Sequence, residues 1–230
     1  LLKAIIVKNT RKQLDNIYDV EELSQYVIDN HVDGVIAFCI DPAQRPAQQI
    51  AKRAGVPAFG TWEQVMALTD KNVFKQLCHD TGVDTILSYS EEDLKTPGTI
   101  KYPVLVKPVD SRGSRGAKEC FTPDELINAI PDAKKESSNG GCIIEKYMTP
   151  DVNQDLTISY LVKDGEPTLV SLGDRHSGRR EDNLDRQLVC TIQPSRFVGE
   201  YMSEADEKIK KLIRHLGIKN GPVFFQGYWD

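Results

Sequence analysis

The sequence has few of the residues that stabilise a fold through disulfides or bound metal ions. It has five cysteines in 230 residues, an odd number, and none of them stands in a CxxC pair. Its four histidines form no HExxH or HxxxH pair. These absences argue against a disulfide framework and against a histidine-built zinc site. We expect the cysteines to be free thiols in a reducing compartment.

Long hydrophobic runs and an excess of positive charge are also missing. The longest apolar run, residues 34–40, is far shorter than the roughly 20 residues that span a bilayer. The first residues show no signal-peptide pattern. The formal net charge of −5 forces no basic face for nucleic acid. We therefore expect a cytoplasmic protein that has neither a membrane nor a nucleic acid as its partner.

What is present is an ordinary globular composition, with 40% hydrophobic and 27% charged residues. Within the first 60 residues, apolar strand-like segments alternate with helical ones. This alternation is typical of a parallel sheet that is covered on both faces. The predicted strands are 4–9, 33–40 and 56–60, and the predicted helices are 19–31 and 46–55. Both ends of the chain look cut, because it starts without methionine and stops inside a strand-like segment.

The rest of the chain is predicted to contain more strands than helices. Thr122 followed by Pro123 is a helix start, and Asp164 with Gly165 predicts the turn of a hairpin over residues 155–174. The remaining predicted strands are 102–110, 117–121, 141–148 and 222–229, and the predicted helices are 61–70, 70–82, 122–130 and 203–217.

One lysine stands inside a predicted strand, in "PVLVKP". Lys107 shares a face with Leu105 and Val109, and burying its charge there is costly unless an anion meets it. The loop "DSRGSRGA", residues 110–117, follows with glycines that can turn backbone N–H groups toward a phosphate. On these residues alone, a surface lysine and a plain hairpin turn remain open. GxxxxGK[ST] and GxGxxG are both absent, which argues against a Walker loop and a NAD-dependent Rossmann enzyme.

Five segments in this order resemble the ATP-grasp superfamily, and within it the carbamoyl-phosphate synthase large-chain type. They are "TDKNVFKQLCHDTGV", "YPVLVKPVDSRGSRGAKEC", "CIIEKYM", "QDLTISYLVKDG" and "GPVFFQGYWD", and the resemblance covers roughly residues 61–230. It implies an α/β fold, with a partial Rossmann-like pre-ATP-grasp subdomain over 1–68 and an ATP-grasp domain over 69–230. A lid subdomain is expected at about 84–145, and the domain is expected to be incomplete at its C-terminal end.

The resemblance implies which residues meet the phosphates of ATP. Lys71 approaches them from the helix before the lid, and Lys107 contacts the α- and β-phosphates. Gly113, Ser114 and Gly116 fall in the loop that closes over the triphosphate, although the family loop is usually richer in glycine.

The same resemblance places the adenine and the ribose. Glu145, Lys146, Tyr147 and Met148 match the hinge that reads adenine, mainly through the backbone at Lys146 and Met148. Taken alone, Glu145 also fits an exposed acid at a strand end that pairs with Lys146. Asp155 stands near the ribose, where the family usually has a glutamate.

The segment "GDRHSGRREDNLDRQ", residues 173–187, is the other candidate for chemistry. Arginine's planar fork suits carboxylates and phosphates, so Arg175, with Arg179 or Arg180, is expected to bind the substrate carboxylate or the transferring phosphoryl group. The alternative is a solvated loop whose charges pair among themselves. His176 is expected to be a structural or surface residue rather than a catalytic one. Gln226 stands at the start of the magnesium-binding region, whose acidic and asparagine ligands usually come later in the family.

The resemblance therefore implies an ATP-dependent ligase that uses ATP and Mg²⁺ and works through an acyl phosphate. Its Arg175 and Lys107 are the expected catalytic residues. A small-molecule carboxylate and an amine are the expected substrates, with C–N bond formation as the outcome, and a homodimer stays open. The alternative function is a non-catalytic nucleotide-binding or interaction module, because the later magnesium ligands are not in this chain.

Overall fold

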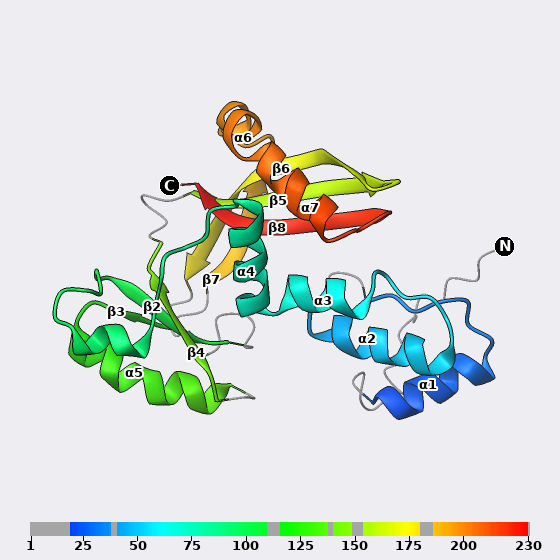
Figure 1. The fold of residues 1–230 in the computed structure, drawn as a ribbon, viewed down its shortest axis with the longest axis horizontal. Helices are drawn as coiled ribbons and strands as arrows, with labels where there is room; N and C mark the ends of the chain where they lie inside the picture. Colours follow the sequence, from blue (N-terminus) through cyan, green and yellow to red (C-terminus); the bar gives the residue numbers. More distant parts are fainter. Residues whose placement is uncertain are drawn as a thin grey trace. The chain divides into compact units, whose positions relative to one another are not determined.

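The computed structural model describes residues 19–37, 41–109, 116–137, 140–148, 154–179 and 186–229. The chain divides into two compact units, Leu1–Thr69 and Asp70–Asp230 (Figure 1). Both units mix helices with β structure. The predicted strand at 4–9 lies outside the described residues.

The first unit is mainly helical in its described part. Its helices are α1 (Val20–Asp29), α2 (Asp41–Ala54) and α3 (Trp62–Thr69). Val27, Val32 and Ile50 form the core between α1 and α2. Val35 and Ala58 form a parallel bridge, which is the β pairing present in the described residues of this unit. The strands predicted at 33–40 and 56–60 meet there in the expected direction, while residues 38–40 lie outside the description.

The second unit contains two four-stranded antiparallel sheets. The small sheet has the order β1-β4-β2-β3, and the large sheet has the order β7-β6-β5-β8. The strands of the small sheet are β1 (Ser88–Tyr89), β2 (Val104–Pro108), β3 (Lys118–Cys120) and β4 (Cys142–Lys146). Those of the large sheet are β5 (Gln154–Lys163), β6 (Glu166–Arg179), β7 (Arg186–Ile192) and β8 (Gly221–Trp229). The helical segments of this unit are α4 (Lys71–Thr81), η1 (Glu91–Lys95), α5 (Pro123–Glu136), α6 (Val198–Glu204) and α7 (Asp206–His215).

Helix α5 covers one face of the small sheet (Figure 1). Val104, Val106 and Ile144 point from β2 and β4 into the core beneath α5, where Leu126 and Ala133 meet them. Because strand side chains alternate, the residues between these apolar ones lie on the opposite face. That opposite face carries Lys107 and Glu145 and is the one that matters for the site.

Two prolines that the sequence places at or beyond helix boundaries lie inside helices instead. Helix α2 begins at Asp41, before Pro46, and α5 continues past Pro131. A proline removes one backbone hydrogen bond, which tertiary packing can outweigh. Ala133, two residues after Pro131, is fully buried in the core of the small sheet, so ending α5 earlier would expose that core.

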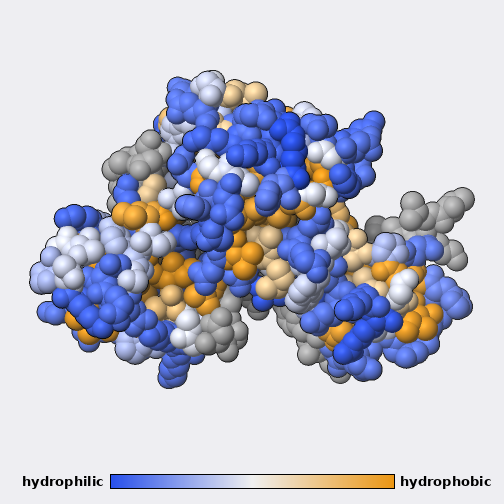
Figure 2. All heavy atoms as spheres, viewed as in Figure 1, coloured by the Kyte–Doolittle hydropathy of each residue, from blue (hydrophilic) through white to orange (hydrophobic). Residues whose placement is uncertain are grey.

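The predicted helix over 203–217 is wrong at its start. Ser203 lies inside α6 and donates to the Glu200 carbonyl, and α7 begins only at Asp206. Ile209, Leu212 and Ile213 form the buried stripe of α7. The outer surface of α7 is hydrophilic (Figure 2).

The charged segment 173–187 is also not a plain loop. Its first half continues β6 as far as Arg179, and its last residues begin β7, an edge strand that pairs with β6. Strands on a sheet edge tolerate charged side chains because solvent reaches them. The segment therefore lacks the alternation of apolar and polar residues by which a strand is usually predicted. Arg180 lies outside the described residues.

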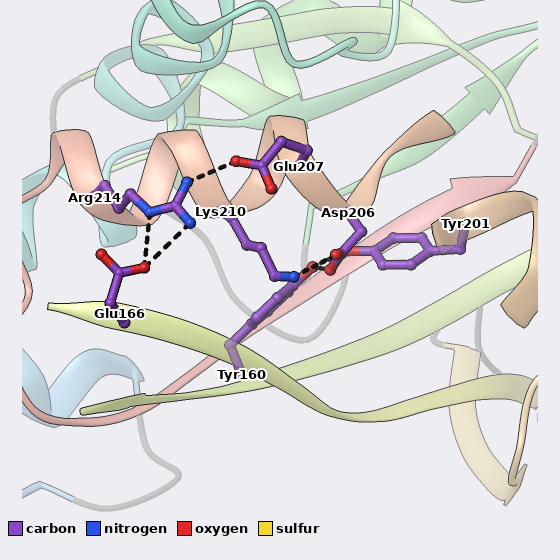
Figure 3. Close-up of polar contacts among 7 residues, drawn as sticks. All are labelled: Tyr160, Glu166, Tyr201, Asp206, Glu207, Lys210 and Arg214. Atoms are coloured by element: carbon purple, nitrogen blue, oxygen red, sulfur yellow. Dashed lines mark hydrogen bonds and ion pairs between the residues drawn. The ribbon is translucent and has the colours of Figure 1, made fainter. Parts of the chain in front are cut away.

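A buried polar network joins the large sheet to α6 and α7 (Figure 3). The Tyr160 hydroxyl on β5 donates to Asp206 Oδ1 at 2.7 Å and lies 2.8 Å from the Tyr201 hydroxyl. Lys210 pairs with the other Asp206 oxygen at 2.6 Å. Burial raises the pKa of both tyrosines far above the ordinary value, so the phenols stay neutral and keep their protons for these hydrogen bonds.

This network predicts a large loss of stability on removing its carboxylate. We expect Asp206→Ala to lower the free energy of unfolding by about 3 kcal/mol, because the Tyr160 hydroxyl and the Lys210 ammonium lose their buried acceptor. Denaturant unfolding measures the change. The control is Glu207→Ala on the same helix, whose side chain is 75% exposed and pairs with Arg214. We expect it to cost less than about 1 kcal/mol, and equal costs for the two variants would contradict the role of the network.

Candidate functional site

The centre of the site is the Glu145 carboxylate on the face of the small sheet that is turned away from α5. Leu105 lies directly opposite Glu145 in the β2–β4 ladder, and Lys107 lies two residues further along the same face. Lys107 forms an ion pair with Glu145 Oε2. Lys75, which reaches over from α4, pairs with Glu145 Oε1 at 2.6 Å. One carboxylate is therefore shared by two lysines from different elements.

Glu145 is a buried acid, with a side chain that is only 4% exposed, and each lysine side chain is 24% exposed. Burial by itself raises the pKa of the carboxyl, but the attraction and hydrogen bonds of Lys107 and Lys75 outweigh it and hold the pKa below its ordinary value. The carboxylate is therefore charged at neutral pH. The reading of Glu145 as an exposed acid paired with Lys146 is wrong, because β2 and α4 bury it.

Helix α4 delivers a second lysine to the same region. Asp70 caps this helix by accepting from the backbone N–H groups of Asn72 and Val73, which fixes its first turn. Lys71 lies one turn before Lys75, so both side chains share one side of α4. The Lys71 ammonium donates to the Val109 carbonyl at 3.1 Å, at the end of β2.

The loop predicted to close over the triphosphate is only partly described. Gly113 and Ser114 lie outside the described residues. Gly116, at the end of the loop, has a φ of +72°, and a Cβ there would lie 2.9 Å from Pro108 Cγ. Glycine is thus required at 116 both by the backbone conformation and by the close approach to β2.

The end of β4 holds the residues expected to read adenine. The Tyr147 N–H donates to the Pro103 carbonyl, and the Lys146 N–H donates to the Leu87 carbonyl on the other side of the strand. The Tyr147 hydroxyl donates to Glu119 on β3 at 2.5 Å, which ties this side chain to the small sheet. Met148 is buried and follows directly. These hydrogen bonds fix the backbone of Lys146 and Tyr147 between the flanking segments at Leu87 and Pro103.

The large sheet brings three further candidates onto one face. Thr157 pairs with Gln226 of β8, so their side chains share a face, and Asp155 lies on that face two residues earlier. Arg175 of β6 joins them, with its Nε 3.6 Å from Asp155 Oδ2. The opposite face of the same strands carries the buried Tyr160 network. Because side chains alternate along a strand, the candidate ligand residues and the core residues lie on opposite faces of the large sheet.

The Arg175 guanidinium is largely buried but incompletely hydrogen-bonded. Its side chain is only 14% exposed, and its buried Nε has no hydrogen-bond partner among the described residues. The distance to Asp155 is too long for a hydrogen bond. A guanidinium in this position can still accept an anionic ligand. His176, next to it, is exposed.

The described residues do not by themselves form a magnesium site. No group of three or more His, Cys, Asp or Glu side chains in the described ranges is arranged to hold a metal ion. Gln226 supplies one amide oxygen, and the nearby Asp155 carboxylate already faces Arg175.

Among the described residues, no helix has the length and apolar character that crossing a membrane requires.

Sequence reasoning missed Lys75. Its signal is its spacing of four residues from Lys71 on a predicted helix, which places both on one side. The partner of Lys75 could not be predicted, because Glu145 is seventy positions later (75 to 145) and is brought to Lys75 only by the tertiary structure.

The Glu145 ion pairs predict a pH dependence of stability. Because the pKa of Glu145 is lower in the folded chain than its ordinary value of 4.5, its contribution is fully present above about pH 5 and is lost as the pH falls through the folded pKa. At pH 7 we expect Glu145→Gln to be less stable than the parent by about 2 kcal/mol. Denaturant unfolding between pH 7 and pH 3 should show this difference shrinking, and a constant difference would contradict it.

Most of the second unit matches a known protein family. Residues 70–225 match the family described as "Carbamoyl-phosphate synthase L chain, ATP binding domain". The carbamoyl phosphate synthase large chain, C-terminal section, of Methanocaldococcus jannaschii is 31% identical over 172 residues. That alignment covers 73% of this chain and 27% of the relative, so the chain spans only part of the proteins it resembles.

Two solved structures share the fold at low sequence identity. A biotin carboxylase–β,γ-ATP complex from Campylobacter jejuni aligns with a TM-score of 0.79 and 18% identity, over 95% of this chain and 50% of that chain. The biotin carboxylase domain dimer of Hydrogenobacter thermophilus 2-oxoglutarate carboxylase aligns with a TM-score of 0.77 and 19% identity, over 92% and 48% of the two chains. With an ATP-grasp fold and a family match across residues 70–225, the chain belongs to the carbamoyl-phosphate synthase L chain ATP-binding domain family.

Proposed function

We propose that this chain binds ATP and serves an ATP-dependent ligase that activates a carboxylate as its acyl phosphate. The observation that carries the proposal is the pair of lysines, Lys75 and Lys107, that share the single buried carboxylate of Glu145. Two cations and one anion leave a positive charge at the surface of the small sheet. A polyphosphate is the anionic ligand that this family binds, and it would complete the neutralisation.

The phosphates are assigned to the small sheet and to α4. Lys107 contacts the α- and β-phosphates, and Lys71 approaches from α4 beside the end of β2. The loop with Gly113, Ser114 and Gly116 closes over the triphosphate with its backbone N–H groups. Lysine suits this role because its ammonium is a compact charge on a flexible stem.

The base and the sugar are assigned to the end of β4 and the start of β5. The Lys146 carbonyl and the Met148 amide are assigned to the adenine edge, as the family resemblance implies. The Lys146 and Tyr147 N–H groups donate to the Leu87 and Pro103 carbonyls and hold this segment in place. Glu145 and the Tyr147 side chain shape this hinge rather than touch adenine. Asp155 is the residue placed for the ribose hydroxyls.

Arg175 is assigned to the reacting end of the nucleotide. Its unpartnered Nε and its low exposure make it a preorganised donor for the transferring phosphoryl group or the substrate carboxylate. A Mg²⁺ ion that arrives with ATP would neutralise phosphate charge. Gln226 would lie near that ion, but the described residues do not complete its ligand set.

The chemistry follows from positioning and charge. A carboxylate or bicarbonate oxygen attacks the γ-phosphorus of ATP, the bond from that phosphorus to the bridging oxygen breaks, and ADP leaves with its electrons. An amine then displaces inorganic phosphate from the acyl phosphate and loses a proton, which leaves an amide or carbamate. No side-chain nucleophile is required, so lysines, Arg175 and loop N–H groups suffice as the protein's contribution.

The first test is nucleotide affinity. We expect Lys107→Ala to raise the Kd for MgATP about tenfold to a hundredfold, because a charged contact to phosphate is lost. Isothermal titration calorimetry measures the Kd. Lys118→Ala is the matched control, since Lys118 is an exposed lysine on β3 of the same sheet. Equal affinity of Lys107→Ala and the parent would overturn the assignment.

The second test separates catalysis from binding in the whole natural protein. ADP release and hydroxylamine trapping of acyl phosphate are followed with bicarbonate and a panel of carboxylates. We expect Arg175→Ala to lower the turnover about a hundredfold with little change in the Kd for MgATP, while His176→Ala leaves both unchanged. ATP binding without turnover on any acceptor would favour the non-catalytic nucleotide-binding module.

A further inference from the structure

The two lysines on Glu145 are not equivalent. Lys75 pairs with Oε1 and Lys107 with Oε2, so each carboxylate oxygen has its own ammonium partner. Lys75 also donates to the Ile86 carbonyl at 3.0 Å and to the Ser88 hydroxyl. Among the described residues, Glu145 is the ionic partner of Lys107. Lys75 is therefore held at three acceptors, whereas Lys107 is held at one.

This difference decides which lysine can move. If Lys107 turns to a phosphate, it gives up one ion pair and gains another of the same kind. Lys75 would give up its hydrogen bonds to the Ile86 carbonyl and Ser88 hydroxyl as well. Both lysine side chains are 24% exposed, so access to a ligand does not separate them. The movable cation is Lys107.

The departure of Lys107 would be costly if Glu145 had no second partner. Its side chain is 4% exposed, and a buried carboxylate without a compensating charge is strongly disfavoured. The nucleotide would have to supply that free energy from its own contacts. With Lys75 in place, the carboxylate keeps one ion pair throughout.

We propose that Lys75 is a positioning residue that holds the charge of Glu145 and so frees Lys107 to bind the phosphates of the nucleotide. This inference rests on the proposed function, because it needs a phosphate as the second partner of Lys107. It assigns a role to a lysine on α4 that does not itself touch the ligand. It also makes the affinity for ATP depend on a contact between α4 and β4.

A double-mutant cycle separates this role from ordinary packing. In the parent background, Lys75→Met should raise the Kd for MgATP about tenfold, because Lys107 becomes the sole partner of a buried carboxylate. In the Glu145→Gln background, the same change should alter the Kd less than about threefold, because no charge needs a partner. Lys208→Met on α7, whose lysine pairs with the exposed Asp84, is the control for loss of a lysine elsewhere.

The second readout is the proton balance of binding. The charged groups around the Glu145 carboxylate are Lys75 from α4 and Lys107 from β2, and β1 contributes the neutral Ser88. In Lys75→Met, the carboxylate loses its last cation when Lys107 turns to phosphate, so it takes up a proton. Calorimetry at pH 6 in two buffers of different ionisation enthalpy should show more proton uptake for this variant than for the parent and Lys208→Met.

The outcomes distinguish the two proposals. Failure of the parent chain to bind MgATP would overturn the proposed function and this inference together. This inference alone would be overturned by the following combination of results. Lys107→Ala weakens the binding of MgATP, but Lys75→Met has equal effects on the Kd in both backgrounds and causes no extra proton uptake. Thermal unfolding shows which variants are folded, and Lys75→Gln replaces Lys75→Met if the methionine variant does not fold.

Discussion

The ion pairs of one buried carboxylate hold together parts of the second unit that are far apart in sequence. Glu145 lies on β4, Lys107 on β2 and Lys75 on α4, and the burial of the carboxylate requires that cations reach it. Through Lys75, this requirement links α4, which packs against α7, to the small sheet. Lys71, one turn earlier on α4, donates to the Val109 carbonyl at the end of β2, and residues 146–148 directly follow Glu145 along the chain.

The two faces of the large sheet carry different kinds of polar side chains. One face of β5 carries Tyr160, whose hydroxyl is bonded to Asp206 and Tyr201 beneath α6 and α7. The other face carries Asp155 and, across the ladder, Arg175. The two tyrosine hydroxyls of this network are hydrogen-bonded, whereas the buried Nε of Arg175 has no hydrogen-bond partner in the described residues and lies 3.6 Å from Asp155 Oδ2. The buried polar network thus lies behind the face that we propose to meet the ligand.

Local signals predicted much of the fold correctly, and they failed where packing decides. The helix predicted over 70–82, the helix start at Pro123 and the hairpin at Asp164 are local features, and they follow from the backbone needs of single residues. Pro131 is a local stop signal that the core under α5 overrides. Edge strand β7 and the break between α6 and α7 leave no clear period in the sequence.

The sequence by itself indicated which residues to consider for a nucleotide: Lys107, Arg175 and the glycine-rich loop from their residue types and local spacing, and Lys71 from the family resemblance. Only the tertiary structure decided which charges neutralise one another. Glu145 looks like a surface acid until β2 and α4 bury it, and Lys75 looks like one of many helix lysines. The physical reason is that ion pairs depend on distance in space and on burial, and neither quantity is encoded in the local pattern of a chain.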